Sequence, residues 1–359
     1  MSQLRSFLNL KRSLKQHRVL ILVLLIGAMT WIGVFSRAST DFLSSGSRPL
    51  RSGWGGVGEF DIFGLTLHYE FEGWADYDYY YQSWGQKFVN GSMPYTEGFN
   101  NTRIDGVDYN TPFFLPPLFL YLCGLGVLMG PVGIGFLISL LGYATVFPVY
   151  GIAKRLSENE TVGAVSAATY LFNPLVLYHT TYQWLNPAPF VFFVVLSYYL
   201  LIQQHRVSGA LAMATAILFK QIAAFFALPI LGYLLRPSPR DVSPDGEPPR
   251  DSKGRLLSDT LDLAGFLKMG AIVVAYMVLW SFPYILDPSN YLYYILQRPG
   301  GVLYDSVTTL PSYNQPITFT VLLIVFGAPE WLAQIFNQGI YYTIFLLPGF
   351  LGALALCLF

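Results

Sequence analysis

Charged residues are scarce in this chain. Asp, Glu, Lys and Arg make up only 12% of its 359 residues, whereas about 25% is typical of soluble domains. Hydrophobic residues reach 53%, and the mean hydropathy is +0.46. This composition excludes an ordinary soluble domain. Several apolar runs approach the length that crosses a bilayer, which indicates a polytopic α-helical membrane protein.

Net charge and metal-binding clusters are also lacking. The 21 basic and 21 acidic residues cancel, so the chain has no general attraction for polyanions, and we expect no nucleic-acid partner. Cys123 and Cys357 lie in apolar runs without neighbouring histidines, which argues against a disulfide framework or a zinc site. The histidines lack the spacing of a metal-binding helix; they are His17, His68, His179 and His205.

The N-terminus carries basic residues without an acidic one. Residues 1–18 are therefore predicted to be a cytoplasmic segment, since positive charge is retained on that side of the membrane. The apolar run 19–36 follows and is predicted to be the first transmembrane helix. A signal peptide is the alternative, but this run is long for one.

Polar segments divide the rest of the chain. Residues 37–131 are predicted to form a long external loop, because the part 37–112 contains ten acidic and only five basic residues. The remaining predicted segments are a transmembrane bundle at 132–235, a cytoplasmic disordered loop at 236–262, and C-terminal transmembrane helices at 263–359 with an external loop at 284–317. The chain ends inside an apolar run, which is typical of a truncated protein.

The run 113–129 is predicted not to cross the membrane. Lys154 and Arg155 follow the next apolar run and should be cytoplasmic, so another full crossing would place them outside. Pro116 and Pro117 suit the first turn of a helix. The expected fold is therefore an all-α transmembrane bundle whose long external first loop carries interfacial helices.

An acidic pair marks the densest polar part of that loop. Asp76 and Asp78 precede a predicted helix from Tyr77 to about Val89, which should stop near Asn90-Gly91. Both carboxylates are expected at the mouth of this helix, with Asp76 as its cap. The alternative is that the two acids only cap and solubilise an interfacial helix.

Aromatic and polar residues offer further candidates for a binding site. Tyr79, Trp84 and Tyr95 are able to stack on sugar faces, although aromatic belts at membrane surfaces supply the same residues without such a role. His179 and Gln183 lie at another predicted external helix end and are candidates for the same cavity. A structural role is the alternative for His179.

Two cations are candidate phosphate contacts. Lys220 interrupts two apolar runs, and a lysine at that depth costs roughly 2.5–3.5 kcal/mol on insertion scales, so a lipid phosphate is a reasonable partner. Snorkelling to the interface is the alternative. Arg298 is the lone basic residue of 284–317 and could contact a phosphate through its donor fork, or pair with Asp287 or Asp305.

Three motifs together resemble a known group of enzymes. Asp76-Tyr77-Asp78-Tyr79, Gly91-Ser92-Met93-Pro94-Tyr95 and Tyr109-Asn110-Thr111-Pro112 follow a first span, as in the GT-C superfamily of membrane glycosyltransferases. The motifs are most similar to those of the mannosyltransferase that adds the first mannose of GPI anchors, and of its archaeal relatives.

This resemblance implies transfer of a hexose from a polyprenyl- or dolichyl-phosphate sugar. The similarity to a mannosyltransferase favours mannose as that hexose. The acceptor would be a lipid-linked glycan, glycolipid or protein at the extracellular or luminal membrane face. It implies an inverting reaction with Asp76 as general base, Asp78 orienting the acceptor, and Lys220 and Arg298 on the donor phosphate. Asp76 and Asp78 are also candidate ligands for Mg²⁺ or Mn²⁺.

Two other functions compete with this interpretation. A transporter or flippase also carries intramembrane charge, but it predicts ionisable residues near the bilayer midplane. Here the acids gather in one external loop, and the apolar runs are nearly uncharged. A non-catalytic lipid-binding protein is the second alternative.

Overall fold

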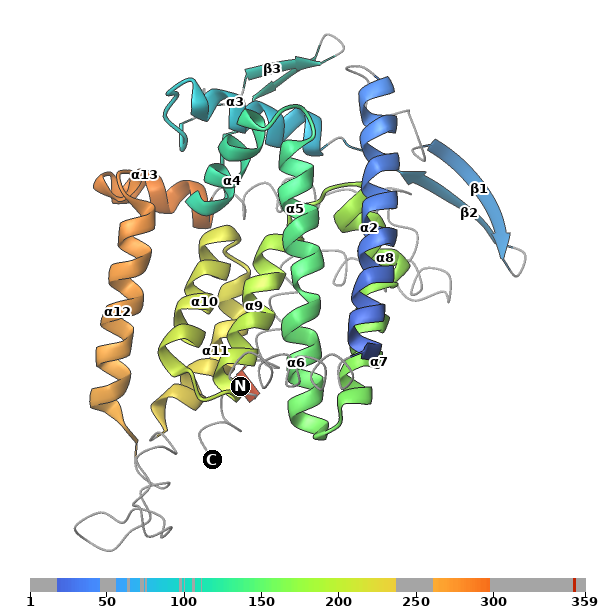
Figure 1. Cartoon of the computed structure of the whole chain (residues 1–359). Helices are drawn as coiled ribbons and strands as arrows, with labels where there is room; N and C mark the ends of the chain where they lie inside the picture. Colours follow the sequence, from blue (N-terminus) through green and yellow to red (C-terminus); the bar gives the residue numbers. More distant parts are fainter. Residues whose placement is uncertain are drawn as a thin grey trace, which may run out of the picture.

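The computed structural model describes most of the central chain. The described residues are 18–45, 56–62, 65–71, 74, 76–96, 99, 101–104, 107–110, 112–236, 261–297 and 351–352. They form a helical bundle, with smaller elements gathered at one end (Figure 1). The all-α bundle expected from the apolar runs is confirmed.

The elements follow one another as mostly short helices. The longer helices are α2 (Arg18–Ser45), α3 (Ser83–Val89), α4 (Pro117–Leu128), α5 (Gly133–Ala144), α6 (Val146–Ser157), α7 (Glu160–Leu171), α9 (Pro187–Ile202), α10 (Arg206–Phe219), α11 (Ala223–Leu235) and α12 (Leu263–Ser281). The shorter ones are α8 (Pro174–Val176), α13 (Pro288–Leu292), the π-helices η2 (Tyr77–Gln82), η3 (Leu177–Tyr182) and η7 (Tyr293–Gln297), and the 3₁₀ helix η6 (Tyr284–Leu286).

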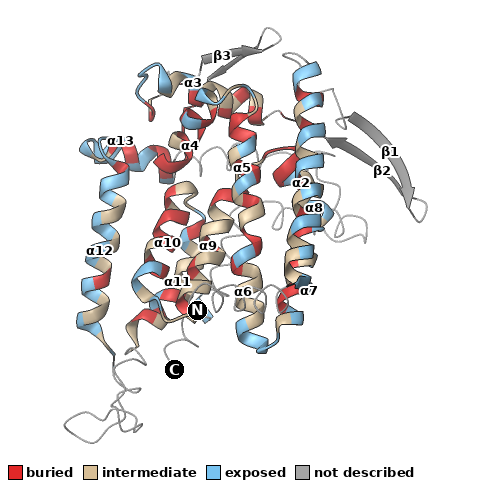
Figure 2. Cartoon of the chain, viewed as in Figure 1, coloured by how far each residue is buried: buried red, intermediate tan, exposed pale blue. Residues whose placement is uncertain are grey.

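Three helical stretches of the described part are long and apolar enough to cross a membrane. They are α2, the continuous pair α5 and α6, and α12. A fourth span is obtained if α7 and the segment Pro174–Tyr182, which meet at a bend of 45°, count as one. Large apolar side chains on the outer faces of these helices are exposed, as on Met29 and Leu279, which fits contact with lipid (Figure 2).

Helix α4 is the element predicted to stay outside the bilayer core. Its 12 residues span about 18 Å at 1.5 Å per residue, well short of the ~30 Å hydrocarbon core. Pro117 is its first residue, a position where the missing amide hydrogen is not needed. Because α10 and α11, with 14 and 13 residues, are similarly short, the non-crossing of 113–129 stays a prediction.

Helix α2 continues to Ser45, past the predicted end at Ser36. Arg37 Nε lies 2.8 Å from Asp41 Oδ2 one turn later, and this pair supports the helix beyond its apolar run. The Tyr182 hydroxyl also donates to Asp41 Oδ2 at 3.0 Å. The upper end of α2 is thereby joined to η3, so the start of the predicted external loop belongs to the bundle.

Two antiparallel hairpins occur in the first loop, where only helices were expected. Strands β1 (Gly56–Ile62) and β2 (Leu65–Phe71) pair with Gly56 opposite Phe71, and β3 (Asn101–Ile104) and β4 (Val107–Asn110) pair with Asn101 opposite Asn110. Each sheet has two strands. The β3–β4 hairpin lies over α3 at one end of the bundle, and the β1–β2 hairpin projects outward beside α2 (Figure 1).

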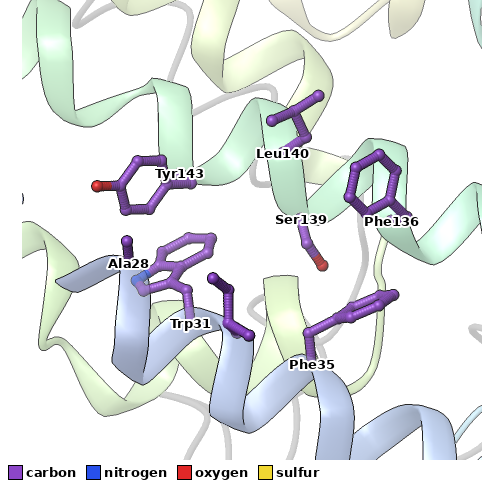
Figure 3. A pocket seen from close by; sticks show the side chains of 8 residues that line it. Ala28, Trp31, Phe35, Phe136, Ser139, Leu140 and Tyr143 are labelled. Carbon is purple, nitrogen blue, oxygen red and sulfur yellow. The ribbon is translucent and has the colours of Figure 1, made fainter. Parts of the chain in front are cut away.

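An apolar groove of about 270 Å³ lies between α2 and α5. Trp31 and Phe35 of α2 face Phe136 and Tyr143 of α5 across it (Figure 3). The two helices are fastened beside the groove, where the Tyr143 hydroxyl donates to the Leu24 carbonyl at 2.7 Å. Its lining places the groove at the level of the apolar part of α2.

Candidate active site

Helices η2 and α3 form the continuous helix predicted after Asp76. It runs from Tyr77 to Val89, and Gly91 follows with φ +82°, a conformation typical of helix ends. The Tyr77 hydroxyl and Gln82 Nε2 both donate to the Pro131 carbonyl, at 2.9 and 2.6 Å. These bonds fix the acidic end of the helix against the turn between α4 and α5.

Asp76 is half-buried at the start of this helix. Its side chain forms no capping hydrogen bond, so the predicted capping role is wrong. Burial raises the pKa of Asp76, and the positive charge of Lys220 opposes that rise. A carboxylate with a raised pKa is a better proton acceptor than an ordinary one.

Lys220 reaches the same place from the turn between α10 and α11. Its ammonium group donates to Asn186 Oδ1 at 2.7 Å and lies 5.8 Å from the centre of the Phe190 ring. The backbone amide of Asn186 in turn donates to the hydroxyl of Tyr81, at 3.3 Å. Asp76, Tyr81, Asn186 and Lys220 therefore form one cluster, which we call the acid–lysine cluster.

The loop that carries Asn186 is held by a buried tryptophan. Trp184 has φ +56° and is fully buried. Its ring packs 4.7 Å from the Tyr77 ring and 5.5 Å from the Phe42 ring, measured between centroids. A Cβ atom on Gly135 would overlap this indole, so α5 needs glycine there. The strained backbone of Trp184, held by its aromatic neighbours, thus positions Asn186 in the acid–lysine cluster.

Gln221 anchors the turn that carries Lys220. Its Nε2 atom donates to the carbonyls of Phe114 and Ile295, at 3.2 and 3.1 Å. The first carbonyl precedes α4, and the second lies in η7. One side chain therefore joins the α10–α11 turn to both the first loop and the later loop.

The two carboxylates of the acidic pair do not converge. Asp76 has helical backbone angles and Tyr77–Gln82 is helical, so residues two apart project to nearly opposite sides. Burial raises the pKa of Asp78 also. No three His, Cys, Asp or Glu side chains gather as metal ligands in the described part of the chain. The Mg²⁺ or Mn²⁺ role of the pair stays a prediction.

The three aromatic residues predicted to stack on sugars are buried. Tyr79 is 8% exposed, Trp84 1% and Tyr95 3%. The Tyr95 hydroxyl donates to the Leu115 carbonyl at 3.0 Å, and its own carbonyl accepts a bond from Asn290 at 3.1 Å. Because a buried ring leaves no free face for a sugar, these side chains act in this structure as packing residues.

The remaining predicted residues occupy different places. His179 is exposed on η3, and its Nδ1 atom lies 2.8 Å from Gln183 Oε1, so the structure brings these two together. Gln183 is buried, as is Trp184, the next residue in the sequence. Arg298 lies outside the described residues, directly after η7.

Sequence reasoning missed Tyr81 and Asn186 as members of the cluster and Gln221 as its anchor. Tyr81 stood in a run of three tyrosines, and the buried alternate positions 77, 79 and 81 could be identified only from the π-helical backbone. Asn186 precedes Pro187 at the start of α9, which is a common place for a cap. Its bond to Lys220 depends on tertiary contacts that have no local signal.

One comparison with known proteins gives a match. Residues 136–298 match the model of the ALG6, ALG8 glycosyltransferase family, a stretch that includes Asn186 and Lys220 and excludes Asp76. No curated protein and no solved structure matches the chain. The family match supports a membrane glycosyltransferase of the GT-C type but not the GPI-anchor mannosyltransferase in particular. Together with the apolar helices, it supports an integral membrane protein of the glycosyltransferase class.

Proposed function

We propose that this protein transfers a hexose from a polyprenyl- or dolichyl-phosphate sugar to a lipid-linked glycan or protein acceptor, at the membrane face that carries α3 and α4. The observation that carries the proposal is the acid–lysine cluster, in which Lys220 acts electrostatically on the half-buried Asp76. One carboxylate and one ammonium group are the two charges that such a transfer needs.

Asp76 is the proposed general base. It takes the proton of the acceptor hydroxyl while that oxygen forms a bond to the anomeric carbon, and the bond from this carbon to the lipid phosphate breaks. Because the attack and the departure occur on opposite faces of the sugar, the configuration inverts. Positioned general bases contribute about 10²- to 10⁴-fold to rates of this kind.

Lys220 is the proposed contact of the departing lipid phosphate. Its ammonium group has three N–H donors, and the bond to Asn186 uses one of them. A fixed cation next to the developing phosphate charge lowers the barrier to leaving-group departure. Arg298 is proposed as a second phosphate contact, because it follows η7, whose Ile295 is tied to the Lys220 turn through Gln221.

The sugar is proposed to be mannose or glucose. The motifs at 76–95 resemble a mannosyltransferase, whereas the matched family model does not support that specificity. The extracellular or luminal placement of the cluster is likewise proposed from the basic N-terminus and the acidic first loop.

The test is sugar transfer by purified protein in lipid. Radiolabelled mannosyl and glucosyl polyprenyl phosphates are supplied with a membrane lipid extract as the source of acceptor. We expect transfer from one donor, and a loss of at least about 100-fold in Asp76→Asn.

Asp78→Asn is the matched control, since it removes the same charge two residues away. We expect a smaller loss, because Asp78 projects away from the acid–lysine cluster. Transfer by Asp76→Asn at the wild-type rate would contradict the proposed base, and no transfer from any donor by folded wild-type protein would favour the lipid-binding alternative.

A further inference from the structure

A large cavity lies at the other end of the bundle from the acid–lysine cluster. Its volume is about 750 Å³, and it is lined by residues of α2, the α5–α6 pair and α9. The turn between α6 and α7 and the start of α2 mark this end in Figure 1, whereas α3 and α4 mark the opposite one. The cavity therefore has no part in the transfer proposed above.

The lining changes from apolar to charged along the bundle axis. Ala144, Phe147, Phe192 and Leu196 line the part nearer the middle of the helices. The part at the helix ends is lined by Lys154, Arg155, Glu158, Tyr199 and Gln203. An apolar compartment that opens into a charged one at a helix end has the polarity of a phospholipid, with acyl chains in the first and a head group in the second.

Among the described residues that line the cavity, one cation and one anion are available to a ligand. Lys154 Nζ lies 2.5 Å from Glu160 Oε1, so this cation is already neutralised. Neither Arg155 nor Glu158 has an ion-pair partner within the described residues. This pattern suits a head group that carries both a phosphate and an ammonium group better than one with only negative charge.

Glu158 occupies a conformation that favours glycine. Its φ is +55°, in the left-handed region directly after α6, where glycine usually ends a helix. The chain leaves the helix at this residue, and the described ion pairs include none between Glu158 and Arg155 three positions earlier. Strained backbone often occurs at ligand sites, so this residue at the rim of the cavity is a candidate contact for a ligand.

We propose that this cavity binds a glycerophospholipid with a primary ammonium group, of the phosphatidylethanolamine class. Arg155 binds the phosphodiester, and Glu158 accepts hydrogen bonds from the ammonium group at the end of the ethylene linker. The acyl chains cover Phe147, Phe192 and Leu196. Choline lipids lack the N–H donors, and glycerol lipids lack the positive charge.

The test is lipid retention by the purified full chain, measured by native mass spectrometry. Equal amounts of phosphatidylethanolamine, phosphatidylcholine and phosphatidylglycerol are offered to the protein in detergent. We expect phosphatidylethanolamine to be retained about tenfold over each of the other two, the size of effect that one charge-assisted hydrogen bond provides. Stronger or equal retention of phosphatidylglycerol would overturn the proposal.

Two variants assign the roles of the charged residues. Glu158→Gln should abolish the preference for the ethanolamine head group while lipid is still retained, and Arg155→Gln should weaken retention of all three lipids. Lys268→Gln, an exposed cation on α12 away from the cavity, is the matched control and should change neither. An unchanged preference in Glu158→Gln would contradict the assigned carboxylate.

Two further measurements distinguish a lipid site from misfolding and from a site for a soluble phosphate compound. Glu158→Gly should lose the preference while its melting temperature rises, because glycine relieves the left-handed backbone; a preference lost through misfolding would lower that temperature instead. Soluble phosphorylethanolamine should fail to displace the lipid, since it lacks the acyl chains. Displacement at equal concentration would show a site for the soluble compound and overturn the lipid proposal.

Discussion

The raised pKa of Asp76 has a kinetic consequence. A general base must be ionised, so transfer should be lost on acidification through a pKa that burial holds above the ordinary aspartate value. Lys220 opposes that rise, so Lys220→Met should move the acid limb of the residual activity to higher pH, while Lys220→Arg should leave it in place. The measurement is the pH profile of transfer under single-turnover conditions, and an acid limb that stays put in Lys220→Met would contradict the coupling.

The same carboxylate should reduce the stability of the folded protein at neutral pH. Between the unfolded and the raised folded pKa, the folded state binds more protons, so stability falls as pH rises through that interval. Asp76→Asn should therefore raise the melting temperature at pH 7, and the gain should fade at pH values below the ordinary aspartate pKa. The melting temperatures of wild type and Asp76→Asn are measured in detergent at several pH values. Asp76→Ala is the control that shows how much stability the side chain contributes through packing.

Asn186 should affect the donor through Lys220. Asn186→Ala removes the acceptor that holds the ammonium group at 2.7 Å, a bond of a charged donor worth about 1.5–3 kcal/mol. We expect the KM for the donor to rise about tenfold or more, whereas Asn186→Asp should retain Lys220 in place. Donor titration under steady-state conditions checks this, and an unchanged KM in Asn186→Ala would remove Asn186 from the site.

Residue types in the sequence were enough to single out Asp76 and Lys220 as candidates, because an acid in an aromatic loop and a lysine between apolar runs are both unusual. The family resemblance placed them in one reaction, but no local pattern tells which helix end meets which loop, so their link through Asn186 and Tyr81 came only from the structure. Trp84 and Tyr95 show the limit of residue type alone. Both are aromatic residues in the right loop, but their burial gives them packing roles.

At the scale of elements, helix positions were more predictable than helix ends. The apolar run 113–129 predicted α4 closely, because hydropathy reports burial in lipid or in the bundle. The extension of α2 to Ser45 depends on an ion pair and a contact with η3, which hydropathy does not register. The two hairpins of the first loop were missed for a related reason, since short strands in a polar segment lack a strong period.

The end of α2 offers a test of what holds η3. Asp41→Ala should lower the free energy of unfolding by about 1–3 kcal/mol, because the buried carboxylate is lost and the Tyr182 hydroxyl is left without this acceptor. Arg37→Gln should cost less than about 1 kcal/mol, since the Arg37 side chain is 64% exposed. Denaturant or thermal unfolding in detergent distinguishes the two, and equal costs would show that the ion pair dominates.

At the scale of the whole molecule, the structure separates two chemically different ends. The acid–lysine cluster lies with α3 and α4, and the cavity lined by Arg155 and Glu158 lies at the other end of the bundle (Figure 1). The basic residues that predicted sidedness, Lys154 and Arg155, lie at the second end. The start of α2, which follows the basic segment 1–18, lies at the same end (Figure 1). That this end is cytoplasmic stays a prediction.

This arrangement predicts the sidedness of single cysteines. Lys87→Cys on α3 and Ser157→Cys at the end of α6 should react with a membrane-impermeant maleimide from opposite sides of sealed vesicles, with position 87 on the extracellular or luminal side. Cys123 is fully buried and should stay unreactive, so only Cys357 needs replacement by alanine in the background chain. Detergent-opened vesicles provide the control, because both positions should then react. Labelling of both cysteines from the same side of intact vesicles would contradict the proposed crossing of α5 and α6, and with it the separation of the transfer site from the lipid cavity.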